Sequence, residues 1–285
     1  MAKAVTRHWF RVALASDTAA PRLVAASGEH MGQAIAEATR ASDRPWPVAV
    51  DHASGDHIPL GESVGKGHVV ALGDAAEVGG FRWPPGVLPS LEGAPRVTGA
   101  RTGWVERPDA RLLVIEAQPD APNLGEAFLS LIERLPSADN LEVRVLDHFE
   151  DTGVTDVWLT SRVDAKWILR FLDDHDDELF GHGHVELSIY VRRHKATLRM
   201  TEHKTLVWLA EERALEAEIT RWLGELGMPP VRELVTVRDA PHFHYRPAGS
   251  RDRKKLGEEL YRQRLRRVDA VRTRAKPTGD PATRT

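Results

Sequence analysis

Apolar residues along the chain recur with two different periods, and each period predicts a different element. In some stretches they fall at every second position, which is typical of a strand with one buried face. The stretch 185–191, VELSIYV, is a clear example. In other stretches, such as 124–135, they follow the i, i+3, i+4, i+7 spacing of a helix with one buried face. The pattern therefore predicts a mixed α+β protein.

Four segments share one plan, in which a strand is followed by an amphipathic helix and a second strand. The third and fourth also resemble each other in sequence, since VWLTSRVDAKWILRFL (157–172) aligns with VWLAEERALEAEITRWL (207–223) when one residue is skipped. We interpret this as an internal duplication. The predicted units are strand 22–27, helix 29–40, strand 47–53; strand 111–117, helix 124–135, strand 141–148; strand 155–161, helix 164–180, strand 185–191; and strand 205–210, helix 211–226, strand 232–237.

Joined end to end, the second and third units give the order strand, helix, strand, strand, helix, strand. This order is the split pattern of a ferredoxin-like sheet. A further strand is expected over 196–200, ATLRM. Because each strand has one apolar side, helices are expected to cover one face of the sheet. The expected fold class is therefore α+β, with repeated strand–helix–strand units in a ferredoxin-like sheet and a small N-terminal α/β domain.

Composition divides the chain into four parts. The clearest boundary is a stretch rich in Gly and Pro, which is typical of a linker. The C-terminal part is rich in arginine and has a narrow apolar stripe, which favours a short helix. The expected parts are a small N-terminal α/β domain (1–78, with added strands over 8–16 and 67–73), a linker (79–104), the duplicated ferredoxin-like α+β domain (105–246), and a basic tail (247–285, helical over 256–274, with a disordered end).

Composition also excludes several kinds of protein. The chain has no cysteine, which excludes disulfides, thiolate nucleophiles and cysteine-bound zinc. Hydrophobic residues make up 41% and charged residues 28%, which is typical of a globular protein. No apolar run approaches the roughly eighteen residues of a membrane span, and the N-terminus lacks a secretory apolar region. We therefore expect a cytoplasmic protein that does not contact a membrane.

Charge is distributed unevenly. Residues 251–276 contain eleven Lys or Arg against four Asp or Glu, whereas the whole chain has a net charge of −3. An acidic body with a basic tail favours binding to a partner through the tail. The partner expected is another protein, acidic in character, with nucleic acid as an alternative. The predicted partner-binding residues are Arg262, Arg264, Arg266, Arg267, Arg272 and Arg274.

Two pairs of histidines have the spacing of metal ligands. They lie in FGHGH (180–184) and in HFH (242–244), and a His-x-His pair on a strand directs both imidazoles to one face. Against a metal site, the segment that aligns with FGHGH in the duplicated unit is GMPP, which has no ligand. Gly181 also suits the left-handed residue that ends a helix. We therefore predict no metal, and keep as the alternative a site formed by His182, His184, His242 and His244.

The acidic run DDHDDE (173–178) lies at the end of a predicted helix. Negative charges at a helix C-terminus are unfavourable, so the run indicates a cationic partner. The basic tail of the chain itself is one candidate for that partner.

No catalytic motif or cofactor-binding fingerprint occurs in the sequence, so no catalytic residue and no cofactor is predicted. The first hypothesis is therefore a non-catalytic binding or regulatory protein, such as an adaptor, an inhibitor or an immunity-type protein. A metal-dependent hydrolase or nuclease that uses the histidine pairs is the second hypothesis. A nucleic-acid accessory protein that acts through the basic tail is the third.

Overall fold

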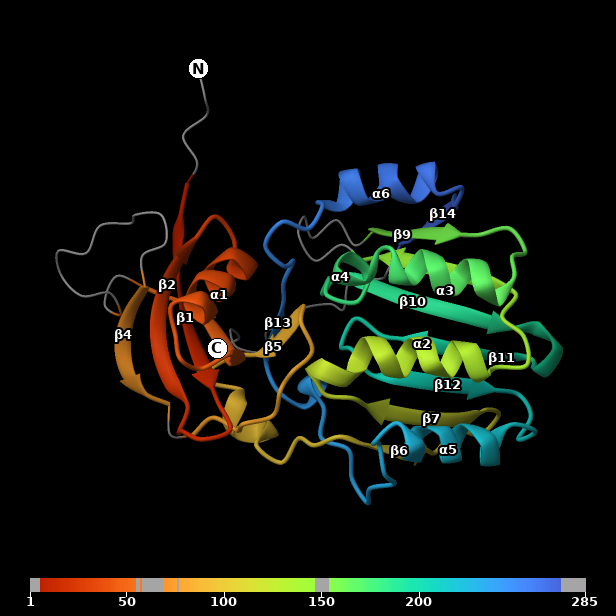
Figure 1. The fold of residues 1–285 in the computed structure, drawn as a ribbon, viewed down its shortest axis with the longest axis horizontal. Coiled ribbons are helices and arrows are strands. Elements are labelled where there is room, and N and C mark those ends of the chain that lie inside the picture. Colours follow the sequence, from red (N-terminus) through yellow and green to blue (C-terminus); the bar gives the residue numbers. More distant parts are fainter. Residues whose placement is uncertain (1–5, 55–56, 58–68, 76, 147–153, 273–285) are drawn as a thin grey trace, which may run out of the picture.

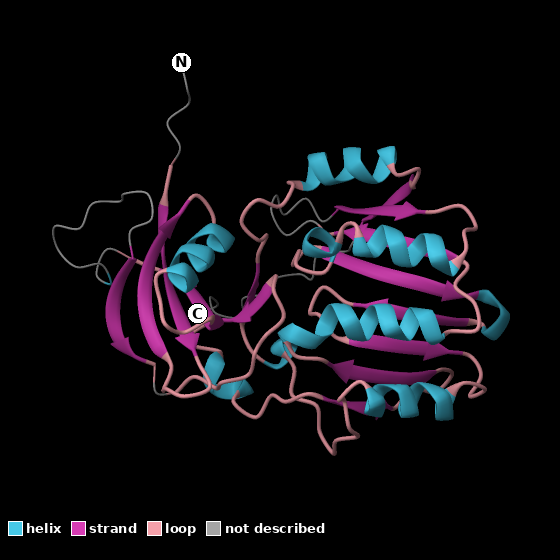
Figure 2. Cartoon of the chain, in the orientation of Figure 1, coloured by secondary structure: helices cyan, strands magenta, loops and turns pink. Residues whose placement is uncertain are grey.

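The computed structural model describes residues 6–54, 57, 69–75, 77–146 and 154–272. Within these residues the chain forms two antiparallel sheets and a short two-stranded ribbon (Figures 1 and 2). The mixed α+β class that the hydrophobic pattern predicts is confirmed. None of the described helices combines the length and the apolar character needed to cross a membrane.

The N-terminal sheet has four strands in the order β3-β1-β2-β4. Helix α1 packs on it through Met31, Ala34, Ile35 and Ala38, which recur at helical spacing and are buried. The first predicted strand–helix–strand unit is therefore confirmed within a few residues. The elements are β1 (His8–Ala15), β2 (Arg22–Gly28), α1 (Met31–Arg40), β3 (Trp46–His52) and β4 (Val69–Asp74).

The second sheet has eight antiparallel strands in the order β14-β9-β8-β10-β11-β12-β7-β6. The core residues alternate along β7, β8, β10, β11 and β12 and meet those of the covering helices in one continuous core. The strands are β6 (Gly103–Arg107), β7 (Leu113–Gln118), β8 (Asn140–Val145), β9 (Val154–Leu159), β10 (Val185–Val191), β11 (Ala196–Met200), β12 (Leu206–Ala210) and β14 (Arg266–Arg272).

Helices α2, α3 and α5 lie across one face of this sheet, as expected (Figure 1). The opposite face is polar, since Glu142, Arg144, Glu186, Ser188 and Tyr190 alternate there with the core residues of β8 and β10. The helices are α2 (Leu124–Arg134), α3 (Ala165–Asp173), α4 (Asp176–Leu179), α5 (Glu216–Glu225) and α6 (Arg253–Arg262), with short 3-10 turns at Ala94–Val97, Ala121–Asn123, Arg192–His194 and Val237–Asp239.

The strand order differs from the expected ferredoxin-like arrangement. The hairpin β11–β12 lies between β10 and β7, so the four strands of the split pattern are not neighbours in one block. Residues 232–237, expected as the last strand of the fourth unit, do not form one. Pro229 and Pro230 precede them and cannot donate to a ladder. The Nε2 of Gln118 donates to the carbonyl of Val235 at 2.9 Å instead.

The helix expected over 164–180 is divided into α3 and α4. The break moves Asp176, Asp177 and Glu178 from the end of one helix to the first turn of the next. There the helix dipole favours negative charge instead of opposing it.

The tail prediction needs a larger correction. The predicted helix over 256–274 ends at Arg262, and Arg264 has a left-handed φ of 67° that turns the chain. Residues 266–272 then form β14, which pairs with β9 and becomes an edge of the large sheet. Leu256, Leu260 and Leu265 are buried, so this segment is packed on the body.

Between the two sheets lies a ribbon of β5 (Val87–Pro89) and β13 (His242–His244) (Figure 1). β5 falls within the segment that was expected to be an irregular linker. Gly183 lies against this ribbon, since its N–H donates to the carbonyl of Tyr245 at 3.0 Å. A Cβ on Gly183 would lie 1.9 Å from the carbonyl oxygen of Gly86, so glycine is required for this contact.

Replacing Gly183 with alanine is therefore expected to force the FGHGH segment away from the ribbon and to lower the unfolding free energy by about 1–3 kcal/mol. Urea unfolding followed by circular dichroism measures the change. Gly224→Ala is the matched control, because a Cβ there meets nothing within 4 Å and alanine should stabilise α5 by about 0.5–1 kcal/mol. A Gly183→Ala protein as stable as wild type would contradict the close approach.

Candidate metal centre

Three histidines meet at the end of the large sheet that faces the ribbon. His242 and His244 point to the same side of β13, and His203 comes from the hairpin between β11 and β12. The ring centroids form a nearly equilateral triangle, with separations of 5.0, 5.0 and 5.1 Å. One nitrogen from each ring lies within 4.8 Å of the other two. Three imidazole nitrogens at these separations are able to bind one metal ion.

The other nitrogen of each ring is held by an oxygen. Nδ1 of His242 lies 2.8 Å from the carbonyl of Ala240, and Nδ1 of His244 lies 2.7 Å from the carbonyl of Gly183. A carbonyl oxygen accepts, so both Nδ1 atoms donate, and in the neutral ring each Nε2 then carries a lone pair. Nδ1 of His203 lies 3.3 Å from a carboxylate oxygen of Glu202. Metal-binding histidines are typically oriented by such outer contacts.

The Nε2 atoms of His203 and His242 are 3.2 Å apart. When both Nδ1 atoms carry the proton, two lone pairs face each other at this distance. A cation between them relieves the repulsion, and it can be a proton on one ring or a metal ion bound by both. Two nitrogens bound to a tetrahedral zinc ion at about 2.0–2.1 Å lie about 3.3 Å apart, which matches the separation observed.

The four histidines of the alternative prediction have different positions. His242 and His244 belong to the cluster. His184 is its neighbour, with a ring centroid 6.2 Å from that of His244, and it is buried. His182 is fully buried and its Nδ1 accepts from the N–H of His184 at 3.2 Å. Burial and the nearby Lys204 lower the pKa of His182 to about 3, so it is a neutral structural residue.

His203 was not among the predicted ligands, although the sequence holds a signal for it. The predicted strands 196–200 and 205–210 leave a short polar connection, TEHK, which must be a hairpin at the end of the sheet where FGHGH begins. Lys204 in this hairpin has a left-handed φ of 64°. Its buried Nζ donates to the carbonyl of His182 at 2.8 Å and so fixes the hairpin to the FGHGH segment.

Two carboxyl groups lie on the Nδ1 side of His203. Glu186, on the polar face of β10, forms a hydrogen bond with Glu202. Burial, followed by this bond and the nearby charge of Glu202, raises the pKa of Glu186 to about 8. Below this pKa Glu186 is protonated and donates to Glu202, and Glu202 in turn lies against Nδ1 of His203.

Replacing Glu202 with glutamine is expected to weaken zinc binding about 10- to 100-fold, because outer contacts of this kind orient the ligand and raise its basicity. Isothermal titration with zinc measures the affinity. Glu133→Gln, an exposed change on α2, is the matched control. Equal zinc affinities of the Glu202→Gln protein and the control would show that Glu202 does not support zinc binding.

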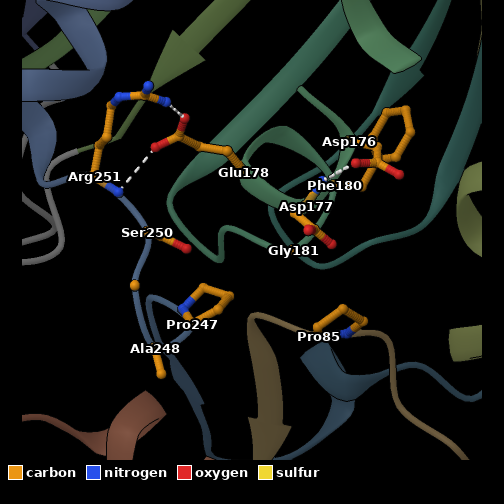
Figure 3. Close-up of a pocket in the computed structure, with 11 residues that line it drawn as sticks. Pro85, Asp176, Asp177, Glu178, Phe180, Gly181, Pro247, Ala248, Ser250 and Arg251 are labelled. Atoms are coloured by element: carbon orange, nitrogen blue, oxygen red, sulfur yellow. Dashed lines mark hydrogen bonds and ion pairs between the residues drawn. The ribbon is translucent and has the colours of Figure 1, made fainter. Parts of the chain in front are cut away.

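The acidic run 173–178 does meet part of the basic tail. One oxygen of Glu178 accepts from the backbone N–H of Arg251 at 2.9 Å, and the other forms an ion pair with the Arg251 guanidinium (Figure 3). These residues line a cavity of about 740 Å³ together with Pro85, Phe180 and Pro247. The cationic partner expected for this run is therefore supplied in part by the chain itself.

Four of the predicted partner-binding arginines have described side chains, and these lie in more than one element. Arg262, at the end of α6, pairs with Glu259, and Arg267 on β14 pairs with Asp156. Arg264 and Arg266 are exposed. Arg272 ends β14, and Arg274 lies outside the described residues. Their role in partner binding stays a prediction.

Comparisons with known proteins do not assign the chain to a family. No protein-family model, no curated protein and no solved structure matches the chain.

Proposed function

We propose that the protein is a metal-dependent hydrolase whose metal, zinc in the first instance, is bound by His203, His242 and His244. The observation that carries the proposal is the convergence of three imidazoles within 4.8 Å while their other nitrogens face oxygen atoms. This favours the second hypothesis from the sequence over the first.

The donor set suits zinc or a similar transition metal. Imidazole is a good ligand for Zn, Cu, Fe and Ni, and three neutral ligands with an open position are typical of catalytic zinc. Structural zinc sites have four protein ligands and no open position. Here three histidines converge and all are half-buried, which leaves the fourth position accessible to water. A zinc ion held by these three histidines would lower the pKa of a bound water molecule to about 7 and so supply a nucleophile for hydrolysis.

The residues around the histidines have positioning roles. The carbonyls of Ala240 and Gly183 fix the rings of the β13 pair, and Glu202 does the same for His203. Lys204 holds the hairpin that carries His203 against the FGHGH segment. The three ligands, from segments distant in sequence, are thereby kept in one orientation.

One cavity is lined by a single histidine of the cluster. It has a volume of about 340 Å³, borders His244, and is lined in part by Phe10, Met31 and Phe243. This volume lies at the lower end of the range for small-molecule sites, and an aromatic lining is typical of such sites.

The test is a set of chromogenic esters and phosphodiesters, such as 4-nitrophenyl acetate and bis(4-nitrophenyl) phosphate, supplied to the zinc-loaded protein. We expect hydrolysis that a chelator abolishes and that His203→Ala loses. His194→Ala is the control, because His194 lies in the β10–β11 turn at the opposite end of the same strands. One bound zinc without hydrolysis of any probe would contradict the hydrolase and leave a metal-binding protein.

An adaptor or regulatory role through the C-terminal segment stays a second hypothesis, as does a cytoplasmic location. A groove beside α6 favours partner binding.

A further inference from the structure

A groove of about 760 Å³ is lined by residues of α6, of the edge strand β14 and of its neighbour β9. Figure 1 shows α6 beside these two strands. Trp158 of β9 lines it, and Tyr261 of α6 lines it with 72% of its surface exposed. Gly257 allows α6 to approach, because a Cβ there would lie 3.0 Å from the Trp158 ring. The groove therefore combines an aromatic residue packed under the helix with an exposed aromatic residue.

The groove is also cationic on its helix and strand sides. Arg253 and Lys254 of α6 and Arg267 of β14 line it. Asp156 bridges the two arginines, with Nε of Arg253 at 2.7 Å from one carboxylate oxygen and Arg267 paired to the other. A guanidinium has five N–H donors, so this ion pair leaves Arg267 able to bind a second acidic group. Lys254 is exposed and makes no ion pair with any residue that the structure describes.

We propose that this groove is a docking site for an acidic peptide segment of a partner protein, with one apolar residue of the peptide seated beside Tyr261 and Trp158. Carboxylates of the peptide contact Lys254 and Arg267. Trp, Tyr and Arg are the residue types that contribute most binding energy at protein interfaces, and all three occur here together. This inference is independent of the metal centre.

The composition of the groove favours a peptide over nucleic acid. Binding to a phosphate backbone needs a continuous basic track, since each neutralised phosphate contributes through counterion release. Here Asp156 and Glu258 lie among the cations, so the groove has mixed charge with a modest positive excess. Such a surface suits alternating acidic and apolar side chains better than a phosphate chain.

The test uses random dodecapeptides displayed on phage and selected against the full chain. Enriched peptides are synthesised and titrated by fluorescence anisotropy against wild type, Lys254→Glu, Tyr261→Ala and Arg193→Glu. Arg193 is exposed in the β10–β11 turn, outside the groove, and serves as the matched charge-reversal control. Thermal unfolding verifies that each variant is folded.

We expect the enriched peptides to carry an aromatic or aliphatic residue among Asp and Glu. Both groove variants should weaken their binding about tenfold or more, while the Arg193→Glu control binds as wild type does. The proposal is overturned if no acidic peptide is enriched, or if the enriched peptides bind Lys254→Glu and Tyr261→Ala unchanged. It is also overturned if a labelled single-stranded oligonucleotide binds with steep salt dependence while the acidic peptides do not.

Discussion

Replacing His242 with alanine should reduce zinc affinity more than about a hundredfold, because it removes one of three ligands, a larger loss than that of an outer contact. Wild type is expected to bind one zinc ion per chain. His203→Ala and His244→Ala should have effects of the same size, since the three rings are equivalent in the triangle. Titration against a competing zinc chelator, with elemental analysis of the dialysed protein, measures both affinity and stoichiometry.

The His194→Ala control should retain wild-type zinc affinity. The three ligand variants should also remain folded, because each replaced ring is half-buried and lies outside the continuous core of the sheet. If wild type takes up no zinc, cobalt or nickel, or if the ligand variants bind as tightly as His194→Ala, the metal centre is refuted.

Replacing Glu186 with glutamine should stabilise the metal-free protein above pH 8. Glu186 has a pKa of about 8 in the fold, against a value of 4.5 without the fold's influence. Between these values the folded state binds a proton that the unfolded state has lost, so the unfolding free energy of wild type falls as pH rises. Glutamine keeps a donor to Glu202 and removes the titration. The unfolding free energy of the variant minus that of wild type should therefore be larger at pH 9 than at pH 4, by on the order of 3–5 kcal/mol.

Urea unfolding at pH 4, 6 and 9 measures this difference. Glu133→Gln, on the exposed side of α2, should follow wild type at every pH. A difference between Glu186→Gln and wild type that stays constant from pH 4 to 9 would show that Glu186 is not protonated in the fold.

Much of the local structure could be predicted from the sequence. The bounds of β10 and β11 agree with the predicted strands 185–191 and 196–200, because apolar and polar residues alternate strictly along each strand and polar or charged residues follow it. The tail could not be predicted in the same way. Its apolar residues fit a helix, and the change to a strand after Arg262 depends on β9 offering a free edge, which is a tertiary contact.

The site was only partly predictable. The HFH spacing indicated a shared face, and His242 and His244 do share one. His203 lies 39 residues from His242 in sequence. The two residues meet because the chain forms β13 outside the large sheet, where it pairs with β5. Nothing in the local pattern of HFH shows that pairing. The left-handed conformation expected for Gly181 is wrong, since its φ is not positive. The glycine that matters for packing is Gly183, which brings the segment against the ribbon.

The ribbon of β5 and β13 gives a bound metal ion a way to affect the stability of the fold. β13 follows the last helix of the large sheet by many residues, yet it pairs with a strand that precedes that sheet. A metal ion on His203, His242 and His244 would close a loop between the sheet and the ribbon, as a disulfide does in other proteins. In a chain without cysteine, this cross-link would restrict the unfolded ensemble and would open or close with metal supply.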